Sequence, residues 1–198
     1  MSAFNVEVSG GGSVRLPTAG KYCDRDIVVQ ATGGGDGKLP GMVERKVEFE
    51  LTADELGQIT AVGSHAFYYH GKLTAISLPV TVTDIERNAF EYCSALASVT
   101  LNEGLKTIGS RAFIYCYALK SITVPGSVTD ISVTAFSNCS KLERVIMRGT
   151  VPPTVAENSF NSCSKLTQII VPTGCGAAYR SATNWSKHAD IIVEEGEA

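Results

Sequence analysis

The feature that most constrains this chain is a sequence period of 23 residues. Phenylalanine recurs at this spacing, with one extra residue before its last copy, and four cysteines follow the same register. A fixed period of this size is typical of stacked repeats, in which each repeat buries its apolar face against its neighbours. The positions that form this structural ladder are Phe67, Phe90, Phe113, Phe136, Phe160, Cys93, Cys116, Cys139 and Cys163.

Each repeat has three parts in a fixed order. An extended run such as 82–85 precedes a short turn with the pattern Ala-Phe-x-x-Cys, as in 89–93, and a strand such as 119–125 follows. In the strand, alternate side chains point inward, and equivalent strands are expected to pair in parallel at roughly 4.8 Å spacing. The pattern predicts an α/β repeat fold, a solenoid of about five 23-residue repeats over residues 59–172.

The segments outside the repeats differ in composition. Alternating valines separated by glycine-rich turns predict a small β-rich unit at the N-terminus. We expect residues 194–198 to be a solvent-exposed end, because most of them are charged. The predicted divisions are 1–32 for the β-rich unit, 33–41 for a Gly-rich linker, 42–58 for an N-terminal cap, 59–172 for the repeats and 173–198 for a C-terminal cap and tail.

Composition and charge exclude several classes of protein. An apolar content of 44% and a charged content of 19% indicate an ordered chain. The net charge of −3 argues against nucleic-acid binding, which usually needs a basic patch. No apolar run is long enough to cross a membrane, and we expect no membrane insertion. The first residues lack the charged and apolar regions of a secretory signal peptide.

The sequence of the repeats resembles the BspA-type leucine-rich repeat. The clearest match is 108–116 followed by 119–125, and the resemblance extends over about residues 59–172. It implies a right-handed, horseshoe-like leucine-rich-repeat solenoid that binds other molecules, typically on bacterial surfaces, without catalysis. The tail with Tyr179 and Trp185 is similar to the closing segment of such arrays. The chain departs from the pattern where His70 replaces the cysteine of the first repeat.

A second, shorter resemblance lies at the N-terminus. Residues 14–29 are similar to a short module of phage and prophage tail-region proteins from Gram-positive bacteria. This implies a virion protein, which needs no signal peptide. The first hypothesis is therefore a phage tail-associated protein that recognises a bacterial surface glycan or protein, or contacts other virion proteins. The alternative is a bacterial cell-surface adhesin that binds host protein. A homotrimer is suggested by analogy with tail receptor-binding proteins, and the sequence leaves the oligomeric state open.

The polar residues give no catalytic or metal-binding pattern. We expect the ladder cysteines to be reduced and buried, and the alternative is that cysteines of neighbouring repeats form disulfides. No C-x-x-C spacing suggests a metal site, and no pairing can be read for Cys23 and Cys175. The three histidines lie in no nucleophile motif, and Gly33–Lys38 lacks the spacing of a phosphate-binding loop. The sequence therefore predicts a protein that is not an enzyme and uses no cofactor.

Tyrosines supply the candidate ligand contacts. Tyr69, Tyr92 and Tyr115 share one repeat position, and Tyr68 and Tyr117 lie nearby. Stacked tyrosines offer an amphipathic surface suited to sugars or protein partners, but the preferred interpretation is that they shield the flank of the turn segment. The outward strand positions become apolar near the C-terminal end, at Ile146 and Ile170. Such a patch is either a contact site or a surface that the C-terminal cap covers.

Overall fold

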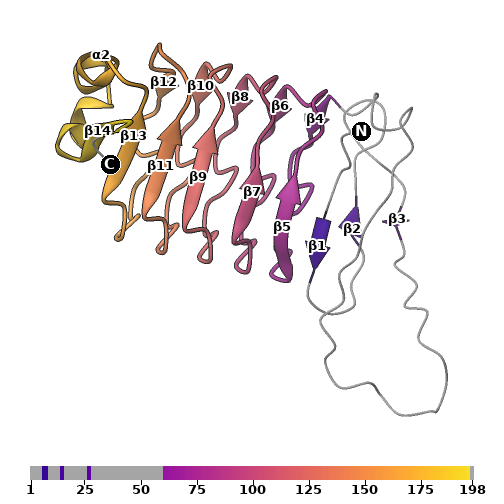
Figure 1. Cartoon of the computed structure of the whole chain (residues 1–198). Helices are drawn as coiled ribbons and strands as arrows, with labels where there is room; N and C mark the ends of the chain where they lie inside the picture. Colours follow the sequence, from indigo (N-terminus) through magenta and orange to yellow (C-terminus); the bar gives the residue numbers. More distant parts are fainter. Residues whose placement is uncertain (1–5, 9–13, 16–25, 28–59, 197–198) are drawn as a thin grey trace, which may run out of the picture.

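A stack of parallel strands in two rows forms the body of the protein, as the computed structural model shows (Figure 1). The structure describes residues 6–8, 14–15, 26–27 and 60–196. The longer strands are β5 (Leu73–Ser77), β7 (Ser98–Thr100), β9 (Ser121–Val124), β11 (Arg144–Met147), β13 (Gln168–Val171) and β14 (Ile192–Glu194). The shorter strands are β4 (Ala61–Val62), β6 (Asp84–Ile85), β8 (Thr107–Ile108), β10 (Asp130–Ile131) and β12 (Thr154–Val155). The predicted repeat solenoid is confirmed.

Strand register follows the sequence period. Ala75 lies opposite Ser98 in the parallel pair β5–β7, and Ser121 lies opposite Arg144 in the pair β9–β11. The shorter strands pair in the same way, with Asp84 opposite Thr107. Each layer is thus one sequence repeat, and equivalent residues stack directly on one another.

The core is a continuous column of phenylalanine rings. Neighbouring rings from Phe67 to Phe160 stack with centroids 5.0 to 5.4 Å apart and planes within 7° of parallel. Alternate strand residues such as Ile122 and Val145 are buried beside them. The spacing of the rings matches the strand spacing, because both are set by the same hydrogen-bonded layers.

The C-terminal segment adds a sixth turn to the five predicted from the sequence. Strand β14 pairs in parallel with β13, with Ile192 opposite Ile169. Before it come helix α2 (Gly176–Ser181) and the 3₁₀ helix η1 (Ser186–Ile191). Figure 1 shows this segment at the end of the stack. This segment lacks the Ala-Phe-x-x-Cys turn, and for this reason the sequence period does not predict it as a repeat.

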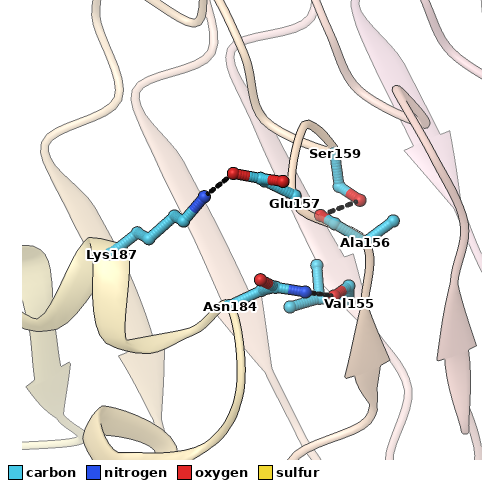
Figure 2. Close-up of polar contacts among 6 residues, drawn as sticks. All are labelled: Val155, Ala156, Glu157, Ser159, Asn184 and Lys187. Atoms are coloured by element: carbon cyan, nitrogen blue, oxygen red, sulfur yellow. Dashed lines mark hydrogen bonds and ion pairs between the residues drawn. The ribbon is translucent and has the colours of Figure 1, made fainter.

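Side chains of this segment bond to the last two repeats. The Tyr179 hydroxyl donates to the carbonyl oxygen of Gly149 at 2.8 Å. The Asn184 amide donates to the carbonyl oxygen of Val155 at 2.8 Å, as Figure 2 shows. Glu194 was expected to lie in a solvent-exposed end, and the structure shows instead that its side chain is hydrogen-bonded. Its carboxylate accepts hydrogen bonds from the backbone N–H groups of Gly174 and Gly176, at 2.6 and 2.9 Å.

The N-terminal region is described only in its short strands. These are β1 (Val6–Val8), β2 (Val14–Arg15) and β3 (Asp26–Ile27). Strands β2 and β3 pair antiparallel, and β1 pairs antiparallel with β5. The predicted linker at 33–41 and N-terminal cap at 42–58 lie outside the described residues. Over the part of the chain that the structure describes, no helix is long and apolar enough to span a membrane.

Candidate functional site

Three tyrosines from consecutive layers form a stack on the turn side of the solenoid. Tyr69, Tyr92 and Tyr115 each follow the core phenylalanine by two residues, and each adopts a left-handed backbone conformation with φ between 59° and 63°. This conformation is uncommon for residues other than glycine. Hydrogen bonds between layers hold it, because the Tyr69 N–H donates to the Glu91 carbonyl at 2.8 Å and the Tyr92 N–H donates to the Ile114 carbonyl at 3.0 Å.

The rings of this tyrosine column lie almost face to face. Centroids are 4.4 Å apart between Tyr69 and Tyr92 and 4.2 Å apart between Tyr92 and Tyr115, with interplanar angles of 21° and 23°. Tyr68 lies edge-on to Tyr69 at 4.6 Å, and Tyr117 is tilted against Tyr115 at 5.9 Å. The structure therefore brings together all five tyrosines that the sequence indicates as ligand contacts.

This packing decides which parts of the rings a ligand can reach. The ring faces between neighbouring layers cover one another, so a ligand reaches the middle ring, Tyr92, only at its edge and hydroxyl group. Tyr69 is 59% exposed, whereas Tyr92 and Tyr115 are partly buried. Partial burial, followed by the neighbouring phenols of Tyr115 and Tyr69, raises the pKa of Tyr92 to about 12. Its hydroxyl is therefore a neutral hydrogen-bond donor and acceptor at physiological pH.

The aromatic column ends in the middle of the array. The equivalent position is Asn138 in the fourth repeat and Ser162 in the fifth, and both keep the left-handed conformation with φ near 60°. The backbone geometry is thus shared by five repeats, and the aromatic surface is confined to the first three. This restriction makes the column a patch on one part of the array.

The cysteine column is part of the core. The thiols of Cys93, Cys116, Cys139 and Cys163 donate to the carbonyl oxygen of the phenylalanine in the preceding repeat, at 3.0 to 3.3 Å. All four are free thiols, and the first three are fully buried. Burial raises the pKa of Cys93 to about 12, so this thiol stays protonated. Cys163, in the last repeat, is only partly buried.

A pocket of about 420 Å³ lies between the fifth repeat and the C-terminal segment. Phe160, Ser162 and Cys163 line one side of it, and Lys187 and His188 of η1 line the other. The Lys187 ammonium forms an exposed ion pair with the Glu157 carboxylate (Figure 2). No motif in the sequence predicts this pocket. Its only signal is the end of the repeat pattern after the fifth repeat.

The histidines occupy unrelated positions. His65 bonds through Nδ1 to the Ser64 hydroxyl at 2.8 Å, and His70 packs edge-on against Phe67. Burial, and then the charge of Lys187, lower the pKa of His188, which leaves its ring neutral near pH 7. Among residues 60–196 and the three N-terminal strands, no group of His, Cys, Asp or Glu side chains is arranged to hold a metal ion.

The apolar outward patch is continued by the C-terminal strand. Ile146 lies opposite Ile170, and Ile170 lies opposite Val193 of β14, so the three form one row across the sheet. All three are partly exposed. Strand β14 therefore extends the patch at the sheet edge, and the cap does not cover it.

Comparison with known proteins places the repeats in a described family. The sequence model of the BspA type leucine rich repeat region matches residues 60–188 in six copies. No curated protein gives a significant match to the chain.

Two solved structures are similar at 27% sequence identity. A leucine rich cell surface protein from Faecalibacterium prausnitzii gives a TM-score of 0.58 over 64% of this chain and 33% of its own. A leucine rich repeat protein from T. pallidum gives 0.55 over 69% of this chain and 62% of its own. This chain thus spans a third of the first protein and less than two thirds of the second.

Proposed function

This chain belongs to the BspA-type leucine-rich repeat family, and from that premise we propose that it is a non-catalytic binding module of a bacterial cell surface that attaches to a host protein. The surface location rests on the similarity to the Faecalibacterium cell surface protein. The tyrosine column is the observation that supports a binding role, because Tyr68, Tyr69 and Tyr117 are exposed beside the stacked rings.

The geometry of the column favours a protein partner over a sugar. A sugar ring that stacks on tyrosine needs an open ring face, and the inner faces here are closed at 4.2 to 4.4 Å. The column instead offers ring edges and hydroxyl groups. Tyrosine is enriched at the energetic centres of protein interfaces for this combination of apolar area and hydrogen bonding.

The phage-tail hypothesis has less support. It depends on residues 14–29, of which only 14–15 and 26–27 are described, and the two similar structures reported above are bacterial proteins. A virion location, other virion proteins as partners and a homotrimer depend on the same segment. The adhesin alternative agrees with both the family and the similarity to a cell surface protein.

Binding of the labelled protein to host cells and extracellular-matrix proteins, beside bacterial envelopes, tests the proposal. We expect binding to host protein that is lost in a Tyr92→Ala/Tyr115→Ala variant. A Val80→Ala/Val151→Ala variant is the control, since both valines are exposed, at 65% and 76%, and lie outside the column. Binding to bacterial envelopes alone would reject the adhesin hypothesis and favour the phage-tail hypothesis.

A further inference from the structure

The turn segments of neighbouring layers are joined by a repeated pair of backbone hydrogen bonds. In each of the first four repeats, the N–H of the core phenylalanine donates to a carbonyl of the next repeat at 2.7 to 2.8 Å. The N–H two residues later donates to a second carbonyl, two residues further along the same acceptor segment, at 2.8 to 3.1 Å. In the fourth repeat the donors are Phe136 and Asn138, and the acceptors are Ser159 and Asn161.

The fifth repeat presents the same two donors without this partner. Phe160 and Ser162 occupy the donor positions, and Ser162 keeps the left-handed conformation with φ of 59°. Within the described part of the chain, neither N–H has a backbone acceptor. On the strand side of this layer, the C-terminal segment supplies a donor, because Asn184 bonds to the Val155 carbonyl. On the turn side, it has no Ala-Phe-x-x-Cys turn whose carbonyls could accept from Phe160 and Ser162.

The space next to these donors is the pocket at the end of the array. Phe160, Ser162 and Cys163 form its inner wall, and Lys187 and His188 of η1 lie across from them. The His188 ring stands edge-on to the Phe160 ring with centroids 5.8 Å apart, so η1 covers the core while the turn remains open. The pocket is therefore the position of a missing turn layer, which we name the end slot.

The charges of the end slot favour a neutral ligand. The one ion pair on its wall, Lys187 with Glu157, is internally balanced. Its remaining polar side chains are serines, asparagines, the Cys163 thiol and the His188 ring, which is neutral near pH 7. The inner layers show what the two donors bind, which is a pair of neutral main-chain carbonyls two residues apart.

We propose that the end slot, formed by Phe160, Ser162, Lys187 and His188, binds a main-chain segment of a partner protein, whose two carbonyls two residues apart accept hydrogen bonds from the Phe160 and Ser162 amides. Main-chain hydrogen bonds to an unpaired backbone edge are an established mode of peptide recognition. This site lies at the opposite end of the array from the first tyrosine layer and stands independently of the proposed function.

Amide hydrogen exchange measured by NMR on the full chain tests this inference. The probe is an acetylated and amidated peptide of residues 156–162, the segment that fills the equivalent position one layer earlier, with Gln in place of Glu157 to keep it neutral. At near-saturating peptide, exchange of the Phe160 and Ser162 amides is expected to slow by about tenfold, whereas the amides of Phe113 and Tyr115, already bonded, are unchanged.

Two variants block the slot without touching the donors. Ser164→Tyr places a large ring in the pocket, and the fold accepts tyrosine at this repeat position, as Tyr117 shows. Lys187→Trp fills it from the opposite wall. Both are expected to abolish the protection by peptide, and Ser94→Tyr, at the same repeat position in the second repeat, is the matched control.

The outcomes separate the alternatives. Protection by peptide that both blocking variants remove and Ser94→Tyr keeps supports the end slot. Protection by sodium acetate and not by peptide would overturn it in favour of an anion site, and exchange that peptide leaves unchanged in the folded wild-type protein would reject it. A Tyr92→Ala/Tyr115→Ala variant should retain the effect, which distinguishes this result from failure of the tyrosine column.

Discussion

The indole nitrogen of Trp185 donates a hydrogen bond to the carbonyl oxygen of Pro153 at 2.8 Å. In the layer before, the equivalent carbonyl of Thr129 accepts from the backbone N–H of Thr154 at 3.0 Å. A tryptophan side chain thus supplies, at the end of the array, the donor that the next repeat supplies elsewhere. The ring also lies 6.1 Å from the last ring of the phenylalanine column, so one residue closes both the hydrogen-bond ladder and the core.

Trp185→Phe should therefore destabilise the protein while keeping an aromatic ring. The substitution leaves the Pro153 carbonyl unpaired, and a buried unsatisfied acceptor costs about 1–3 kcal/mol. Urea unfolding followed by circular dichroism measures the loss. Tyr117→Phe, at a 39% exposed position, serves as the control. Equal unfolding midpoints for the two variants would show that the indole bond contributes nothing.

Phe113→Ala should give a larger loss, because Phe113 has stacked rings on both sides, at 5.0 and 5.2 Å. Removing a fully buried phenylalanine costs about 3–5 kcal/mol from lost burial and the cavity that remains. The exposed substitution Ser121→Ala, measured under the same denaturant series, gives the baseline. A midpoint shift for Phe113→Ala no larger than this baseline would contradict the role of the ring column.

The tyrosine column should make stability depend on alkaline pH. Because the pKa of Tyr92 is about 12 in the folded protein, against an ordinary value of 10.0, the folded state keeps a proton that the unfolded state loses. Stability is then unaffected below pH 10 and falls as the pH rises from 10 to 12. Urea midpoints at pH 8 and 11 should differ less in Tyr92→Phe than in the wild type. An identical difference in both proteins would show that Tyr92 ionises normally.

The sequence predicts the layers of this protein well, because one repeat is one layer and equivalent residues must stack. The phenylalanine and tyrosine columns follow directly from that register. The left-handed conformation of Tyr92 does not, since it is imposed by hydrogen bonds between layers rather than by the residue itself. The capping roles of Asn184 and Glu194 also escape prediction, because they depend on which carbonyl or amide groups the last layer leaves unpaired.

Thiol reactivity should differ within the cysteine column. Cys139 is fully buried, and the neighbouring Cys163 thiol and then burial raise its pKa, whereas Cys163 is partly exposed and the neighbouring Cys139 thiol lowers its pKa. Thiolate character and access control alkylation. Iodoacetamide labelling of the native protein, mapped by mass spectrometry, should modify Cys163 at least about tenfold faster than Cys139. Labelling in denaturant is the control, and equal native rates would contradict the burial pattern.

Gly109→Ala tests a position where the repeat pattern and the structure disagree. The equivalent residues in the next two repeats are Ser132 and Ala156, so the pattern alone predicts that alanine is tolerated. At Gly109, however, an added Cβ would lie 2.6 Å from the carbonyl oxygen of Ile85, a rigid backbone atom, and the layers would have to separate locally.

Such overpacking typically costs about 1–3 kcal/mol, and we expect a loss in that range for Gly109→Ala. Ser110→Ala, at the next and only partly buried residue, should change stability by less than about 0.5 kcal/mol. The denaturant midpoints of the two variants measure this difference in stability. If Gly109→Ala is as stable as Ser110→Ala, the close approach between the Ile85 and Gly109 layers is not fixed, and the array tolerates any small residue there, as the sequence pattern alone suggests.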